Sequence, residues 1–178
     1  MKNIITSILL LLIFINCSKP VARKPISKNS GTFIKESVTR NLELKKKEEV
    51  LIKNIIEKDT INKYIQSGNG FWYSYVAKDS LTKPKPIFGD VVNFDYNLKK
   101  LDGNTIYSKK ELSNQTYAID KEVYFYGLRE GIKLLQEGES AVFIFPSQFA
   151  YGYYGDEKKI GSNVPLIAEI TLNSINKQ

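Results

Sequence analysis

The sequence predicts an α+β fold, in which a curved antiparallel β-sheet wraps over one short helix and is preceded by an N-terminal helix. Residues 33–66 contain neither proline nor glycine, and their apolar residues recur at helical spacing. After them, segments typical of β-strands precede and follow one short segment that has an apolar stripe at helical spacing. Because repeated helices do not separate these strands, we expect them to pair antiparallel and to pack on that one helix.

The composition excludes several kinds of active site. The chain has 178 residues, of which 42% are hydrophobic, so it can bury one core and carry additional segments. It contains no histidine and a single cysteine, Cys17. A Ser-His-Asp triad, a Cys-His pair or a zinc site cannot be assembled within it. Carboxylate or lysine chemistry, binding, or a reaction that needs only a shaped pocket remains, and no metal or cofactor is expected.

The positive charge is concentrated near the N-terminus. Residues 1–50 hold ten Lys and Arg against four Glu, whereas residues 51–178 hold sixteen basic against fifteen acidic residues. The folded part is therefore nearly neutral and has no basic stripe of the kind that contacts phosphates. We expect no nucleic-acid partner.

The first seventeen residues are similar to a bacterial lipoprotein signal. Lys2 precedes an apolar run from Ile4 to Ile15, which is too short to span a membrane and has the length of a secretory signal. Residues 1–16 are therefore predicted to be a signal peptide, and Cys17 is predicted to carry a lipid that anchors the protein to a membrane. The alternative is an ordinary signal peptide followed by an unmodified cysteine. Residues 17–32, which are basic and contain two prolines, are predicted to be a disordered tether.

Residues 33–68 are predicted to form a helical N-terminal segment. Ile34, Val38 and Leu42 recur every four residues, which is typical of an amphipathic helix. Two interpretations are open: the helix packs on the following domain, or it serves as a dimerisation or spacer arm. The charged run from Leu44 to Val50 interrupts a coiled-coil seam and favours the first.

Residues 69–178 are predicted to be the folded domain. Residues 71–78 are rich in aromatic and β-branched side chains and form a predicted strand. A second predicted strand leads into the hairpin turn Asp102-Gly103 and returns over residues 105–108. Strict alternation on this second strand places four side chains on one face: Val92, Phe94, Tyr96 and Leu98.

The second half of the domain contains the short helix and two further strands. Leu128, Ile132 and Leu135 form one apolar stripe between Gly127 and Gly138, which predicts a short helix with a glycine stop. Residues 141–146 and 165–175 read as strands, and the last of them closes the chain.

The order of these motifs resembles the FKBP-type peptidyl-prolyl cis-trans isomerases. The motifs are GDVV, FDY, LDG, TIYS, GLREG and PSQFAYGYYG, followed by an apolar strand, and they cover about residues 87–175. The N-terminal signal, the helical segment and GFWYSY further resemble the gliding-motility-associated FKBP-type lipoproteins of Bacteroidetes. The resemblance implies an isomerase without a cofactor that acts on proline-containing polypeptide clients. It also implies an envelope protein, lipid-anchored and facing the periplasm, and leaves the oligomeric state unknown.

The resemblance implies a proline pocket made of nine residues. Tyr96 matches a wall tyrosine, the Tyr151 hydroxyl matches a donor to a ligand carbonyl, and Phe125 matches the position whose backbone N–H meets the ligand. These three are the predicted catalytic residues. The predicted substrate-binding residues are Ile106, Tyr107, Tyr124, Leu128, Ile160 and Ala168.

Four of these positions depart from the family pattern. Ile106 and Ala168 stand where the family has Phe, and Leu128 stands where it commonly has Trp. Tyr107 occupies the position of the pocket aspartate, and Asp95 is expected to point away and not to replace it. The pocket is thus expected to be apolar but differently shaped. For residues such as Tyr96 and Leu128 the alternative is a role in the core alone. Residues 156–159 are expected to be a solvated loop tip, although the resemblance implies that this loop overhangs the pocket and can select substrates.

Isomerisation of the bond before proline suits a chain without histidine. The barrier is ~18–20 kcal/mol because resonance gives the C–N bond partial double character. An apolar pocket favours the twisted transition state, and a 10⁴-fold acceleration requires about 5.5 kcal/mol of differential stabilisation. The alternative function is a non-catalytic FKBP-like module of an envelope motility or secretion complex, which the replaced aspartate and Trp favour. A purely structural lipoprotein would leave the aromatic loop near Tyr151 unexplained.

Overall fold

The computed structural model describes residues 30–177. The predicted signal peptide, Cys17 and most of the predicted tether lie outside the described residues. The chain divides between Val38 and Thr39 into two units, and the described part of the first is only the beginning of a helix. The second unit holds the rest of that helix and all of the strands.

The N-terminal helix α2 (Ser30–Lys58) begins slightly before the expected segment and ends well before residue 68. The Asp59 carboxylate accepts hydrogen bonds from the backbone N–H groups of Ile61 and Asn62, both at 3.0 Å. Such local side-chain bonds compete with the helical ladder, so the chain leaves the helix here. The remainder of the predicted helical segment is a turn followed by strand β1 (Ile65–Gln66).

Within the second unit, α2 packs through its C-terminal half. Ile52 is fully buried and forms an apolar cluster with Trp72 and Ile144 of the sheet. The interpretation of a helix packed on the domain is therefore confirmed for this half, and a dimerisation or spacer role stays a prediction. The exposed large apolar residues of the helix are Ile34, Val38, Leu42, Val50 and Leu51.

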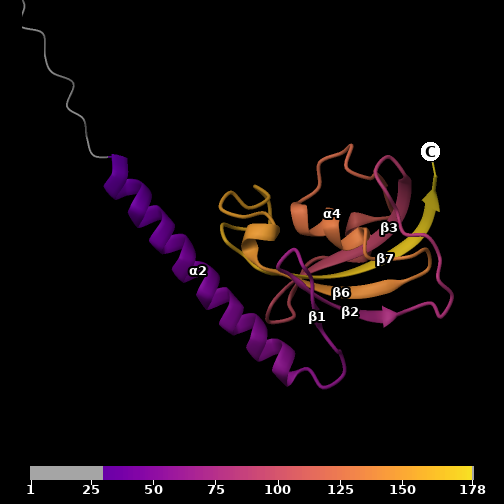
Figure 1. Cartoon of the computed structure of the whole chain (residues 1–178), viewed down its shortest axis with the longest axis horizontal. Coiled ribbons are helices and arrows are strands. Elements are labelled where there is room, and N and C mark those ends of the chain that lie inside the picture. Colours follow the sequence, from indigo (N-terminus) through magenta and orange to yellow (C-terminus); the bar gives the residue numbers. More distant parts are fainter. Residues whose placement is uncertain (1–29, 178) are drawn as a thin grey trace, which may run out of the picture. The chain divides into compact units, whose positions relative to one another are not determined.

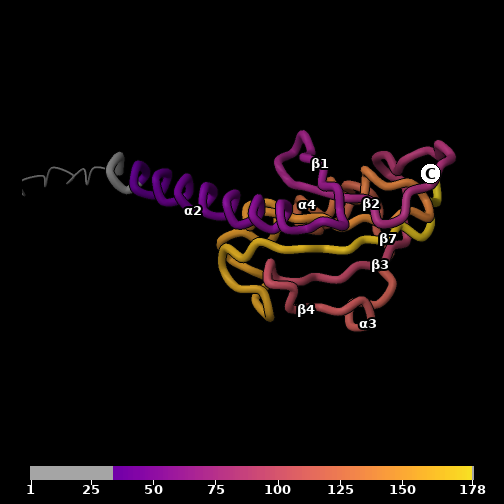
Figure 2. Tube along the Cα trace, turned by 90° about the horizontal axis from the view of Figure 1, so that it is seen from below, coloured from indigo at the N-terminus to yellow at the C-terminus, as the bar shows by residue number. Residues whose placement is uncertain are grey.

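The strands form one antiparallel sheet, as predicted (Figure 1). The sheet runs in the order β1-β2-β6-β7-β3, and β3 then pairs with both β4 and β5. Figure 2 shows β4 beyond β3, on the side away from β7. After β1, the strands are β2 (Trp72–Ala77), β3 (Val91–Lys100), β4 (Thr105–Tyr107), β5 (Gln115–Ala118), β6 (Ser140–Phe145) and β7 (Leu166–Asn176).

Helix α4 (Tyr126–Ile132) packs closely on the sheet (Figure 1). A Cβ atom at Gly131 would lie 3.1 Å from the ring of Phe143, and one at Gly127 would overlap the ring of Phe145. Only glycine permits this approach of the helix to β6. The helix ends earlier than the predicted stop at Gly138, yet the three residues of the predicted stripe and the four alternating residues of β3 are all buried.

Besides β1, three short elements were not predicted. They are α3 (Lys109–Leu112), β5 and the 3₁₀ helix η2 (Ser147–Phe149). Each has at most four residues, which is too few for hydrophobic periodicity to identify it. Local capping gives α3 its start, because the Ser108 hydroxyl oxygen accepts a bond of 3.2 Å from the Glu111 N–H.

The packing of α2 predicts unequal effects for two neighbouring positions. Ile52→Ala removes a fully buried side chain and should lower the free energy of unfolding by about 2–5 kcal/mol. Leu51→Ala is the matched control, because that side chain is 53% exposed, and should change it by less than about 0.5 kcal/mol. Urea denaturation followed by the fluorescence of Trp72, the only tryptophan, measures both. Equal losses would contradict the docking of this half of α2.

Candidate functional site

A cavity of about 290 Å³ lies where the β3–β4 hairpin, α3 and the loop after β6 meet. Leu98 and Leu112 give it apolar walls, and the rings of Tyr107 and Tyr151 stand beside them. Asp156 and Lys158 of the loop complete its lining. Two leucines and two tyrosines therefore share the cavity with one carboxylate and one ammonium group.

Tyr151 is held between the start of α4 and this cavity. Its ring centroid lies 5.1 Å from that of Phe125, which is the N-cap residue of α4. Phe125 in turn contacts Phe145 edge to face, at 5.5 Å between centroids. Burial, reinforced by the negative charge of Asp156, raises the pKa of Tyr151 to about 12. The Tyr151 hydroxyl is therefore protonated at neutral pH and can donate a hydrogen bond.

The structure brings all nine predicted pocket residues into one cluster of packed side chains. Only Tyr107 and Tyr151 among them line the cavity. Their roles toward a substrate stay predictions. The fully or nearly fully buried members are Tyr96, Leu128, Ile160 and Ala168, and the partly buried members are Ile106, Tyr107, Tyr124, Phe125 and Tyr151.

Two of the predicted tyrosines stabilise the cavity wall from behind. The ring of Tyr96 lies 5.4 Å from that of Phe94, and burial raises the pKa of Tyr96 above its ordinary value. Tyr124 donates a hydrogen bond of 2.9 Å to the side-chain oxygen of Gln115 and contacts Phe94 edge to face. Tyr96 is buried and Tyr124 is partly buried, so both rings pack inside the same cluster as Tyr151.

The loop after β6 supplies the carboxylate that position 107 lacks. Asp156 is only partly exposed, and its carboxylate accepts a hydrogen bond from the Tyr107 hydroxyl. It also accepts bonds from the backbone N–H groups of Lys158, at 3.0 Å, and Ile160, at 2.7 Å. The expectation of a solvated loop tip was therefore wrong for Asp156, and right for the exposed residues 157–159. Asp95 instead bonds Asn173, at 2.7 Å, as an outward-facing residue of β3.

Asp156 can turn into the cavity because of the glycine before it. Gly155 has φ of +71°, and a Cβ there would overlap the carbonyl oxygen of Ile160. The Asp156 N–H donates a bond of 3.0 Å to that same carbonyl. Any residue other than glycine would force this loop open.

Lys159 joins the loop to the β4–α3 segment from the outer, exposed side. Lys159 forms an ion pair with Glu111 of α3. Its ammonium nitrogen lies 4.8 Å from the centroid of the Tyr107 ring, within reach of a cation–π interaction. The loop is thus fastened to the β4–α3 segment by Asp156 on the inside and by Lys159 on the outside.

The described residues 30–177 contain no group of three or more Asp, Glu, His or Cys side chains placed to hold a metal ion. Within the same residues, no helix combines the length and the apolar character needed to cross a bilayer.

A family model described as FKBP-type peptidyl-prolyl cis-trans isomerase matches residues 82–173, which is more than half of the chain. The chain belongs to this family. Residues 82–173 include the cavity, the Tyr107–Asp156 pair and the nine predicted pocket residues. The narrower resemblance to gliding-motility lipoproteins is not part of this match.

One curated relative is a probable bacterial isomerase. This chain is 29% identical over 131 residues to the probable FKBP-type peptidyl-prolyl cis-trans isomerase FkpA of Neisseria meningitidis serogroup B (strain MC58). That alignment covers 74% of this chain and 46% of the relative, so the chain spans about half the length of that protein.

The solved structures show the fold. A peptidyl-prolyl cis-trans isomerase from Pseudomonas syringae pv. tomato matches with a TM-score of 0.58 and 20% identity, over 72% of this chain and 92% of that one. FkpA from Escherichia coli matches with a TM-score of 0.60 and 17% identity, over 98% of this chain and 81% of that one. The predicted FKBP-like α+β fold is confirmed.

Sequence reasoning missed Asp156, Leu98, Leu112 and Lys158 as residues that line the cavity. Leu98 was placed on the correct face of its strand but was assigned no role in the pocket. One signal pointed toward Asp156: a phenol in place of an acid adds a hydrogen-bond donor that requires an acceptor. The loop geometry that brings Asp156 there depends on contacts far apart in the sequence.

The hydrogen bonds of Asp156 predict a specific loss of stability in acid. Partial burial raises the pKa of Asp156, but the bonds from Tyr107 and from the N–H groups of Ile160 and Lys158 outweigh it and leave the pKa below its ordinary value. A lowered folded-state pKa stabilises the protein above the unfolded pKa of about 3.9, and this stabilisation is lost as the pH falls through the folded pKa.

Asp156→Asn should therefore flatten the decline of unfolding free energy from about pH 5 downward, relative to wild type. Urea denaturation at a series of pH values measures this decline. Glu157→Gln, at the exposed neighbouring position, is the matched control and should follow wild type. Parallel curves for wild type and Asp156→Asn would show that the carboxylate does not hold the loop.

Proposed function

We propose that this protein accelerates cis-trans isomerisation of the peptide bond before proline, with the cavity beside Tyr151 as its site. The observation that carries the proposal is the position of Tyr151. Its protonated hydroxyl stands at a cavity with Leu98 and Leu112 as walls, and its ring is held against Phe125. Membership of the isomerase family supports the same function.

The geometry suits a reaction that needs no covalent chemistry. The planar X-Pro amide places negative charge on its carbonyl oxygen, and water stabilises this planar form more than the twisted one. In the cavity, the leucine walls and tyrosine rings replace that water. The twisted transition state then loses less solvation than the ground state, which lowers the barrier.

The Tyr151 hydroxyl orients the client in this proposal. A client carbonyl that accepts its hydrogen bond is fixed while the proline ring enters between the apolar walls. The buried Tyr96 lies in the same cluster of side chains behind the cavity. The Asp156 carboxylate is occupied by Tyr107 and two backbone N–H groups, so it gives the cavity a fixed polar edge.

The alternative of a non-catalytic binding module rested partly on the replaced aspartate and Trp. Asp156 brings a carboxylate to the same cavity from another direction, which weakens the first reason. Leu128 is a fully buried residue of α4 in the same side-chain cluster as Tyr151, and its role as the pocket floor stays a prediction. The isomerase proposal therefore accounts better for the site as it is built.

A matched pair of loop variants tests the isomerase proposal. Tyr151→Phe removes the donor hydroxyl from the cavity and should lower kcat/KM about tenfold, equivalent to about 1.4 kcal/mol. Tyr153→Phe removes a hydroxyl from the same loop, at a side chain that is 68% exposed, and should leave kcat/KM unchanged. The assay follows cis-to-trans exchange in a short X-Pro peptide. Absence of acceleration by the wild type would leave the binding module as the function.

We further propose that Cys17 carries a lipid and holds the domain in the cell envelope, facing the periplasm. The support is the N-terminal sequence, in which a short apolar run after Lys2 leads to the only cysteine. The clients would then be proline-containing segments of envelope or secreted proteins. The narrower proposal of a role in a gliding-motility machinery rests on the resemblance of the signal, the helical segment and GFWYSY alone.

Replacement of the cysteine tests the anchor. Cys17→Ser removes the thiol that would be acylated, so the protein should move from the membrane fraction to the soluble fraction of cells. Cell fractionation followed by immunoblotting measures this. Lys19→Ser, two residues further on, is a control that should leave the protein in the membrane fraction. Membrane attachment of Cys17→Ser at the wild-type level would refute lipidation.

A further inference from the structure

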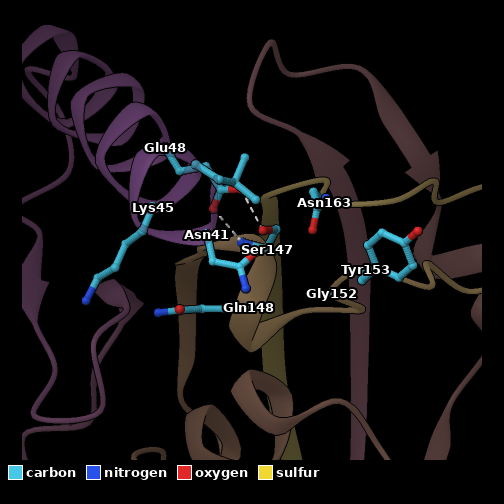
Figure 3. A pocket seen from close by; sticks show the side chains of 9 residues that line it. Asn41, Lys45, Glu48, Ser147, Gln148, Gly152, Tyr153 and Asn163 are labelled. Carbon is cyan, nitrogen blue, oxygen red and sulfur yellow. Dashed lines mark hydrogen bonds between the residues drawn. The ribbon is translucent and has the colours of Figure 1, made fainter. Parts of the chain in front are cut away.

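A buried carboxylate of α2 reaches the loop that carries Tyr151. Glu48 is only 5% exposed although it is ionisable. Its Oε2 atom accepts a bond of 2.8 Å from the Ser147 backbone N–H, and its Oε1 atom accepts one of 2.6 Å from the Ser147 hydroxyl (Figure 3). Both carboxylate oxygens of Glu48 therefore accept a hydrogen bond from the same residue, Ser147.

The burial of Glu48 requires these bonds. A carboxylate taken out of water is costly unless charge-assisted hydrogen bonds replace its hydration. Ser147 is itself 2% exposed, so its N–H and hydroxyl would also lack partners without Glu48. Neither the isomerase chemistry nor the packing of Ile52 uses this pair.

Ser147 is the residue from which the Tyr151 backbone is held. It begins η2, directly after β6 and Pro146. Its carbonyl oxygen accepts hydrogen bonds from the N–H groups of Ala150, at 3.0 Å, and Gly152, at 2.9 Å. These two residues flank Tyr151. Ser147 is thus held by Glu48 through its backbone N–H and hydroxyl, and it holds both neighbours of Tyr151 through its carbonyl oxygen.

The other side of the loop is closed by a further bond. The Gly152 carbonyl accepts a hydrogen bond of 2.8 Å from the Asn163 N–H. A hydrogen-bonded path therefore runs from Glu48 through Ser147 and Gly152 to the segment that leads into β7. Tyr151 stands within this path with its ring against Phe125.

A second cavity lies beside the pair. It measures about 220 Å³ and is lined in part by Asn41, Lys45 and Gln148 (Figure 3). If the carboxylate were lost, water could enter from this cavity and hydrate Ser147. The fold would then survive, while the exact placement of the loop would not.

We propose that Glu48 is a positioning residue for the isomerase site, which it serves by fixing Ser147 and through it the backbone on both sides of Tyr151. The inference rests on the proposed function of the Tyr151 cavity. It assigns the C-terminal half of α2 a part in substrate binding, although α2 contributes no residue to that cavity.

A matched pair of variants on one helix tests the proposal. Glu48→Gln keeps the size of the side chain but removes its charge. The Gln oxygen can accept from the Ser147 N–H and its NH₂ can only donate to the Ser147 hydroxyl oxygen, so both charge-assisted bonds become weaker neutral ones. Glu43→Gln makes the same change at an exposed residue of α2. If the loop is correctly placed in only a fraction of Glu48→Gln molecules, KM should rise about tenfold while kcat stays within about twofold. Glu43→Gln should match wild type in both constants.

Hydrogen exchange of the Gly152 amide, followed by NMR, measures how often the loop opens and does not depend on catalysis. That amide donates to Ser147, so its exchange should become about tenfold faster in Glu48→Gln and stay unchanged in Glu43→Gln. Ser147→Ala removes only the hydroxyl donor and should change KM and exchange in the same direction, by about threefold. It also serves as the second variant should Glu48→Gln fail to fold, which Trp72 fluorescence reports.

The Tyr151→Ala background decides whether Glu48 acts through Tyr151. With the ring removed, the added effect of Glu48→Gln on kcat/KM should fall below about twofold. A tenfold effect in that background would overturn the assignment, and so would wild-type exchange of Gly152 in both Glu48→Gln and Ser147→Ala. If the wild type accelerates no isomerisation, the proposed function fails, and the exchange of Gly152 still decides whether Glu48 holds the loop.

Discussion

The pairing of β3 with β7 is the interaction on which the rest of the molecule depends. It runs from Val91 opposite Asn176 to Lys100 opposite Leu166 and joins segments far apart in the sequence. It brings the hairpin that carries Tyr107 beside the loop that leads into β7, so the bond between Tyr107 and Asp156 depends on this ladder. Pairing between segments so far apart in the sequence is the part of a fold that costs most loop-closure entropy.

The carboxylates of Glu48 and Asp156 hold the glycine-rich loop after β6 in one conformation. Glycine loses more backbone entropy on ordering than other residues do, so a loop with Gly152, Gly155 and Gly161 is costly to fix. Glu48 and Asp156 offset this cost because each accepts hydrogen bonds from backbone N–H groups of the loop, and bonds to a charged acceptor are stronger than neutral ones. The aromatic rings can then pack on a defined backbone.

The parts that the sequence predicted are those whose signals are local. Alternation identified the buried face of β3, and the Gly127–Gly138 stripe identified the helix over the sheet, because period and burial act on neighbouring residues. The end of α2 at Lys58 was missed because hydrogen bonds to the Asp59 side chain override helical spacing there. Asp156 and Glu48 were missed because each is defined by a partner, Tyr107 and Ser147, that only the tertiary fold brings near.

The Tyr107–Asp156 pair also limits which residues position 107 can hold. A tyrosine reaches Asp156 across the length of its ring, and an aspartate at 107 would be too short to make the same contact. Asp156 would then keep only its bonds from the N–H groups of Lys158 and Ile160, and the loop would lose the bond that joins it to β4. The phenol and the acid therefore cannot simply trade positions unless the backbone of the loop moves as well.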